Sequence, residues 1–247
     1  MPQKQQEPDR QSRKLQIDHR FLPTIQLLPT ELQNVGDAAM TNKFLRRYTN
    51  IPALIYLLKN QSLTLLNPKS WDDTNDSYAL QVYKNKRNLK TVLALCFTET
   101  VETYHHWHVF AGGAGGACIT FNRRNLLRAL DEYVGVKHKG VLYRKLDEMN
   151  DGSVLVDQLP FIKRSGFQDE REFRVIYENK SETFQTIDIP VPLTTIERIH
   201  LSPWLPKALA DDTKFALNSI AGCADLQIFR STLVGNQRWK RVVSNAA

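Results

Sequence analysis

Cysteine is scarce in this sequence of 247 residues. The three cysteines, Cys96, Cys118 and Cys223, are odd in number and lie far apart. This excludes the dense disulfide framework of small secreted proteins and a cysteine-rich zinc site. Long apolar runs are missing too, since none approaches the roughly 20 residues of a membrane-spanning helix, and no signal peptide is recognisable. We therefore expect a soluble cytoplasmic protein that makes no contact with a membrane.

Motifs for binding phosphate or metal are also missing. The glycine-rich run 111–116 leads from an expected helix into an expected strand, whereas phosphate-binding loops lead from a strand into a helix. His105, His106 and His108 do not share one helical face, so they lack the usual spacing of metal ligands. The acidic loop 71–76 has no glycine at the sharp turn of a calcium loop. The sequence thus predicts no metal site.

Positive charge, by contrast, is in excess. The net charge is +7 and the isoelectric point about 9.3, while the hydrophobic fraction of 42% is ordinary for a globular protein. An excess of this kind suits an acidic partner such as nucleic acid or a phosphate-bearing ligand. The alternative is a solvated basic surface. The candidate nucleic-acid contacts are Arg123, Arg124, Lys163 and Arg164.

Short strands mixed with short helices, without a regular βαβ rhythm, predict an α+β fold. Residues 1–40 are polar and dotted with proline, which is typical of a mobile tail, and 41–247 form a single domain. Thr49 or Asn50 is expected to cap a helix with Pro52 in its first turn. Strands are expected at 43–50, 61–66, 91–97, 117–121, 139–143, 167–177, 183–189, 196–201 and 226–230. Further helices are expected at 102–110, 125–130 and 206–220, and the segment 183–189 as the hairpin partner of 167–177.

The stretch 166–177 is the most informative, because polar and apolar residues alternate in its second half. In a strand, Glu170, Glu172 and Arg174 then share one face. Two carboxylates on one face repel each other unless a cation uses them. One interpretation is an exposed face of mixed charge. The other is a carboxylate pair at the edge of a cleft, able to stabilise a cation or orient a nucleophile.

Several segments resemble a large bacterial family known as domain of unknown function twenty-nine seventy-one. They are 45–49, 67–73, 95–100 with Trp107, and 170–174, in the order of the family and within residues 43–240. The sequence differs from that family at Trp71-Asp72-Asp73-Thr74, where Phe-Asn-Asp-Pro is usual, and at Thr98, where serine is usual.

The same layout resembles, more distantly, the ADP-ribosyltransferase superfamily. One branch builds its site from an arginine on the first strand, a strand with two hydroxyl residues, and a Glu-x-Glu pair. This resemblance implies a mixed, mostly antiparallel split sheet and NAD as a substrate. Arg47 or Arg46 matches the arginine, Thr98 and Thr100 match the hydroxyl pair, and Glu170 and Glu172 match the carboxylates.

The chemistry of that transfer gives each residue an expected role. Breaking the bond to nicotinamide takes the ribose through an oxocarbenium-like state, which a carboxylate stabilises. The carboxylate is Glu172 in this scheme, while Glu170 orients or deprotonates the acceptor. Thr98 positions the ribose or Glu172. Arg47 or Arg46 binds the diphosphate. The remaining candidates for cofactor binding are Tyr48, Trp71, Trp107 and Thr100.

The acceptor stays open between nucleic acid, with RNA favoured, and protein. The resemblance also implies a toxin or phage-defence effector with a neutralising antitoxin. One alternative is a non-catalytic module that binds nucleotide or nucleic acid, and another is a metal-dependent nuclease using Asp72, Asp73 and Glu172. The transferase hypothesis requires Glu172 and Arg47 to line the same cavity.

Overall fold

The computed structural model describes residues 42–150, 152 and 154–246. These residues belong to one compact unit, Met40–Ala247. The predicted N-terminal tail, residues 1–40, lies outside the described residues. Within the described part, no helix is both long enough and apolar enough to cross a bilayer.

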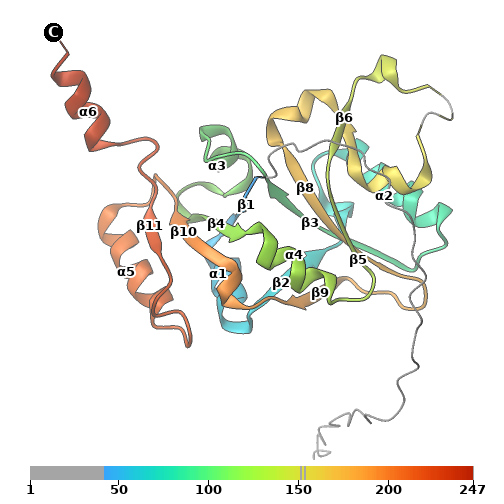
Figure 1. Ribbon diagram of the computed structural model, residues 1–247, viewed down its shortest axis with the longest axis horizontal. Coiled ribbons are helices and arrows are strands. Elements are labelled where there is room, and N and C mark those ends of the chain that lie inside the picture. The colour runs from blue at the N-terminus through green and yellow to red at the C-terminus, as the bar shows by residue number, and fades with distance from the viewer. Residues whose placement is uncertain (1–41, 151, 153, 247) are drawn as a thin grey trace, which may run out of the picture. The chain divides into compact units, whose positions relative to one another are not determined.

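Figure 1 shows the order of the helices and strands along the chain. The strands are β1 Phe44–Asn50, β2 Ser62–Leu66, β3 Thr91–Thr98, β4 Gly116–Asn122, β5 Val136–Gly140, β6 Leu142–Arg144, β7 Ile162–Arg164, β8 Glu172–Asn179, β9 Thr186–Pro190, β10 Ile196–Leu201 and β11 Ile228–Arg230. The helices are α1 Ile51–Asn60, α2 Thr74–Lys86, α3 Tyr104–Phe110, α4 Arg123–Asp131, α5 Lys207–Asn218 and α6 Gln237–Ser244.

One nine-stranded sheet organises the described residues. Its order is β11-β10-β4-β1-β3-β2-β9, with β8 paired to β3 and β5 to β8. Pairing is antiparallel throughout this sheet except between β10 and β11, and a separate parallel pair joins β6 to β7. The expectation of a mixed α+β fold with a mostly antiparallel sheet is confirmed.

The main core lies on one face of this sheet. Leu45, Phe97, Phe121 and Val175 occupy alternate strand positions and point to that face, where α1, α4 and α5 pack on them. On the other face, α2 packs over β3 and β8 around Ile176, and α3 packs over β1 and β4. The second face is therefore covered by two separate helices.

Two strands share one edge of β3, and this produces a gap. β1 meets that edge at a single pair, Arg46 with Thr98, and β2 meets it at another, Leu66 with Ala94. Between these two points the backbone of β3 has no strand partner on that side. Since β8 covers the opposite edge along its full length, the gap opens between β1 and β2 alone.

Local sequence signals explain α1. The side chain of Asn50 accepts a hydrogen bond from the backbone N–H of Ala53 at 2.9 Å, and Pro52 occupies the first turn. Both follow from the preference of helix N-termini for a side-chain acceptor and for a residue without an N–H donor. The predicted cap at Asn50 is confirmed.

The expected strand 167–177 begins only at Glu172, because 165–170 form a 3-10 helix, and two further expectations are wrong. Segment 183–189 is not the partner of 167–177, because β9 pairs with β2 whereas β8 pairs with β3 and β5. The loop 71–76 was expected to be a turn, yet α2 begins inside it at Thr74. The cause is Asp73, whose carboxylate caps the helix by accepting hydrogen bonds from the N–H groups of Asn75 and Asp76.

Replacement of Asn50 by alanine should lower the free energy of unfolding by about 1 kcal/mol, because the N–H of Ala53 loses its acceptor. Urea denaturation measures the change. Serine at the same position also accepts this bond, so Asn50→Ser should unfold close to the wild type. Equal losses in both variants would contradict the capping role.

Candidate functional site

A cavity of about 450 Å³ opens where β1 and β2 diverge on the edge of β3. Its walls come from β1, β3 and β8, from the N-terminal part of α2, from α3, and from the segment 163–170. Both Glu172 and Arg47 line it, although they are 125 positions apart in the sequence. The volume lies within the range of ordinary small-molecule sites, about 300–1,000 Å³.

The Arg174 guanidinium organises the acidic side of this cavity. Arg174 is fully buried, and it donates to both carboxylate oxygens of Glu172 at 2.7 and 2.9 Å. It also donates to both oxygens of Asp76, on α2, at 2.8 and 2.6 Å. The Trp71 ring covers the guanidinium, 5.0 Å from its centre. The planar fork of arginine thus binds two carboxylates at once.

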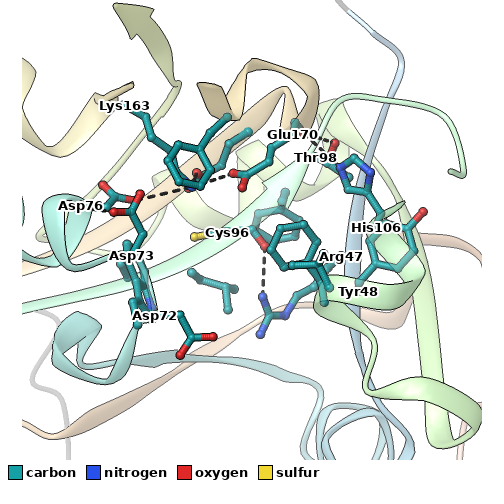
Figure 2. Close-up of a pocket in the computed structure, with 18 of the residues that line it drawn as sticks. Arg47, Tyr48, Asp72, Asp73, Asp76, Cys96, Thr98, His106, Lys163 and Glu170 are labelled. Atoms are coloured by element: carbon teal, nitrogen blue, oxygen red, sulfur yellow. Dashed lines mark hydrogen bonds and ion pairs between the residues drawn. The ribbon is translucent and has the colours of Figure 1, made fainter. Parts of the chain in front are cut away.

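Lys163, from β7, supplies a second cation to the same carboxylates. Its ammonium group lies 2.6 Å from Glu170, 3.4 Å from Glu172 and 3.8 Å from Asp76. Figure 2 shows Lys163 and Asp76 on one side of the pocket, with Arg47 away from them. Three carboxylates therefore meet two cations here, which balances most of the buried charge.

The two glutamates reach the cavity by different routes, which corrects the expectation of one strand face. Glu172 is the first residue of β8, but Glu170 ends a 3-10 helix, Ser165–Glu170. Between them Arg171 has φ +42°, a left-handed conformation that ends the 3-10 helix before β8 begins. Arg171 is exposed and pairs with neither carboxylate in the described structure.

Thr98 and His106 hold the backbone of Glu170. The Thr98 hydroxyl donates to the carbonyl oxygen of Glu170 at 2.6 Å, and His106 Nε2 lies 3.3 Å from the same oxygen. Burial lowers the pKa of His106, so the ring is neutral at pH 7. Thr98 thus lies at the predicted site, but its hydrogen bond positions Glu170 rather than Glu172.

The environment separates the pKa values of the carboxylates. Burial alone would raise the pKa of Glu172, but the charge and hydrogen bonds of Arg174 outweigh it and lower that pKa below 4.5. Burial raises the pKa of Glu170, and Lys163 only partly opposes this effect. Burial likewise raises that of Asp76. Glu172 is therefore held ionised, whereas Glu170 is the more basic of the pair.

Arg46 and Arg47 both line the cavity, through different contacts. Arg47 reaches into the gap beside β3 and donates to the unpaired carbonyl oxygen of Cys96 at 3.0 Å. Arg46 donates to the carbonyl oxygen of Thr100 at 2.7 Å. Each guanidinium has further N–H donors that these hydrogen bonds do not use. Among the described residues neither forms an ion pair, so both can accept an anionic ligand.

The other candidates for cofactor binding divide into two groups. Tyr48 and Trp71 line the cavity. Trp107 does not: it is fully buried, packs against the edge of the Tyr48 ring, and donates its indole N–H to Glu102. Thr100 lies outside the lining as well, and its carbonyl oxygen accepts from Arg46. Stacking of Trp107 on a ligand is therefore excluded by its position.

The four candidate nucleic-acid contacts do not form one surface. Lys163 is enclosed by the carboxylates of the cavity, with 9% of its side chain exposed. Arg123 pairs with Glu99 and lies over the Phe173 ring. Only Arg124 and Arg164 are exposed. Lys163 is thus a component of the cavity rather than of a basic surface.

Sequence reasoning overlooked two residues of the cavity. One is Asp76, and the other is His106 in its role as a partner of the Glu170 carbonyl oxygen. Asp76 was considered only as one acid in a turn. The signal was available, because Asp73 is a good N-cap and would place Asp76 in the first turn of a helix beneath Trp71. In the part of the chain that the structure describes, no cluster of three or more His, Cys, Asp or Glu side chains is arranged to bind a metal ion.

No family model and no curated protein matches this chain. The solved structures that resemble it distantly include two of DarT from Thermus sp. 2.9. Thermus sp. 2.9 DarT in complex with ADP-ribosylated ssDNA has a TM-score of 0.41 and 10% identity, over 77% of this chain and 94% of that one. Thermus sp. 2.9 DarT in complex with carba-NAD+ has a TM-score of 0.39 and 12% identity, over 77% and 96%. A likeness of this size carries no argument about activity, and membership of the family twenty-nine seventy-one stays a prediction.

Replacement of Arg174 by methionine should destabilise the fold by roughly 3–5 kcal/mol, because Glu172 and Asp76 would remain buried without their cation. Urea denaturation monitored by circular dichroism gives the free energy. Arg171→Met is the matched control: it removes the same charge at an exposed position and should change stability by less than about 0.5 kcal/mol. Similar values for the two variants would show that the Arg174 cluster is not structural.

Proposed function

We propose that this chain is an NAD-dependent ADP-ribosyltransferase. One observation carries the proposal: Arg47 of β1 and Glu172 of β8 line the same cavity, opened by the divergence of β1 and β2. The register adds support, because Arg46 pairs with Thr98 and Thr98 pairs with Glu172 on adjacent strands. With strands spaced by about 4.8 Å, Arg46 and Glu172 are roughly 10 Å apart across the sheet.

The charges of the cavity match those of NAD. The nicotinamide ring is cationic and the diphosphate is anionic. The carboxylates of Asp76, Glu170 and Glu172 suit the nicotinamide ribose, and the guanidinium groups of Arg46 and Arg47 suit the diphosphate. The ring of Tyr48 offers an aromatic wall.

In the proposed reaction, the bond between the ribose C1′ and the nicotinamide nitrogen breaks, and nicotinamide leaves with the electron pair. The acceptor forms a new bond to C1′ and gives up its proton. Glu172, held ionised by Arg174, stabilises the positive charge that develops on the ribose. Because the geometry of Glu172 is fixed before the substrate binds, little reorganisation opposes this step.

Glu170 takes the proton of the acceptor. Its raised pKa makes it a stronger base than an exposed glutamate. Its carboxylate is paired with Lys163 in the free protein. Reaction therefore requires that Lys163 move or share Glu170 with the acceptor.

A nucleic-acid acceptor accords with the net charge of +7. The preference for RNA, the role as a toxin or phage-defence effector, and the antitoxin partner remain hypotheses. RNA and DNA oligonucleotides should therefore be compared directly, together with total cell protein.

Glu172→Gln should abolish transfer of label from ³²P-NAD to the acceptor while leaving NAD affinity within a few-fold of the wild type, because the amide keeps the shape but not the charge. Label transfer and calorimetric NAD binding measure the two effects. Glu182→Gln, at an exposed position, is the control and should behave as the wild type. Full turnover in the Glu172 variant would refute the proposal, as would NAD binding by the wild type without turnover on any acceptor.

The pH dependence should report Glu170. Its pKa in the folded protein is raised, so kcat/KM should fall as the pH drops through a value above 4.5. Glu170→Gln should remove this acidic limb and lower the rate about 10²–10⁴-fold at pH 7. Lys163→Met should shift the limb to higher pH, because the ammonium group lowers the pKa of Glu170. An unshifted limb in both variants would rule out Glu170 as the base.

A further inference from the structure

A single row of paired residues leads from the cavity across the sheet. The row runs Glu172, Thr98, Arg46, Thr120 and Arg198, on strands β8, β3, β1, β4 and β10. Residues directly opposite each other in an antiparallel ladder point to the same face. With four strand intervals of about 4.8 Å, the row spans roughly 19 Å.

A β-bulge turns Arg198 to this face. The register of β10 against β4 shifts between Ile196 and Arg198, so one extra residue, Glu197, is inserted there. Ile196 consequently packs in the main core, while Arg198 pairs with Thr120 on the opposite face. Without the bulge, strict alternation would place Ile196 and Arg198 on the same face.

The cations on this part of the sheet are not neutralised. Arg198 is half-buried and Lys43 is exposed, and over residues 42–150 and 154–246 neither forms an ion pair with a carboxylate. Both lie over the Phe44 ring, at 5.8 and 5.3 Å from its centre. Arg46 keeps free donors beside them. Unpaired guanidinium and ammonium groups held on a strand face are suited to phosphate groups.

Aromatic rings lie next to these cations. Phe229, on β11, is 45% exposed and pairs in register with His200 of β10, whose ring centre is 6.0 Å away. Burial lowers the pKa of His200, and the charges of Arg198 and Arg46 lower it further, against the opposite effect of Glu102. A neutral His200 and Phe229 offer aromatic surface to a base. Aromatic side chains beside a basic track are the usual platform for single strands.

We propose that the part of this sheet face that α3 leaves accessible binds a single strand of nucleic acid next to the cavity. It consists of Lys43, Phe44, Arg46, Arg198, His200 and Phe229. A single strand fits better than a duplex, because the bases of a duplex are stacked on each other and cannot cover the exposed rings. Arg46 belongs both to this face and to the lining of the cavity, so a strand bound here lies beside the cavity that contains the proposed base, Glu170. This last step rests on the proposed transferase function.

The test is binding of a fluorescently labelled, mixed-sequence oligonucleotide of about 12 nucleotides, as DNA and as RNA, to the full chain. Anisotropy is measured over a series of salt concentrations. Arg198→Gln should raise Kd about five- to tenfold and reduce the slope of log K against log salt by about 0.7, which corresponds to one lost phosphate contact on a single strand. Arg128→Gln, an exposed arginine on α4 over the other face of the sheet, is the matched control and should change neither.

Phe229→Leu separates stacking from charge. It keeps an apolar side chain but removes the aromatic face, so Kd should rise at least about fivefold with the salt slope unchanged. Because Arg198 and Phe229 are not buried, circular dichroism should show both variants folded. Wild-type affinity in either variant, or equal losses in Arg198→Gln and Arg128→Gln, would overturn the binding face.

NAD hydrolysis without oligonucleotide distinguishes this inference from the proposed function. Arg198→Gln should hydrolyse NAD at the wild-type rate but transfer ADP-ribose to the oligonucleotide less efficiently. If the wild type neither hydrolyses nor transfers, while Arg198→Gln still loses oligonucleotide affinity, the transferase proposal fails and the binding face stands. If NAD turnover is intact and Arg198→Gln binds the oligonucleotide like the wild type, the binding face fails and the transferase proposal stands.

Discussion

A single buried guanidinium determines how the candidate site is built. Arg174 has no exposure to solvent, and its donors are distributed over Glu172 beside it on the sheet and Asp76 on α2. Removing three charged groups from water is costly, and only the nearly complete set of hydrogen bonds offsets that cost. The same contacts fix α2 against β8 and orient Glu172. Folding and the geometry of the carboxylate therefore depend on one interaction.

The cavity results from how strands compete for one edge of β3. β1 and β2 each reach that edge at a single residue pair, and the backbone between those points is left for side chains and ligand. Arg47 donates a hydrogen bond to the carbonyl oxygen of Cys96, which has no strand partner, and its side chain therefore lies in the gap. A backbone acceptor that lacks a strand partner thus positions a cation at the cavity wall. The split in the sheet and the placement of Arg47 are two aspects of one geometry.

Much of this could be predicted from the sequence, because the signals are local. The Asn50 cap, the buried run of β3 and the alternation in β8 each depend on neighbouring residues. Pairing between distant segments could not be predicted in the same way. The segment of β9 was assigned the wrong partner, because the alternation of residues in a strand does not specify which other strand it pairs with. The structure of 165–171 was missed since a left-handed Arg171 is unusual for a residue with a side chain. The role of Asp76 depends on Arg174, 98 positions away, and no local pattern encodes that contact.

The turn at Arg171 has a consequence for how this protein could change over time. Glu172 is anchored in the sheet, whereas Glu170 ends a short, largely surface segment whose backbone is held mainly by Thr98 and His106. Substitutions in 165–169 can therefore reshape the surroundings of one carboxylate while the other keeps its alignment. In a transferase, that separation would let acceptor choice drift while the donor chemistry is preserved, so the segment is the natural place to begin retargeting the protein.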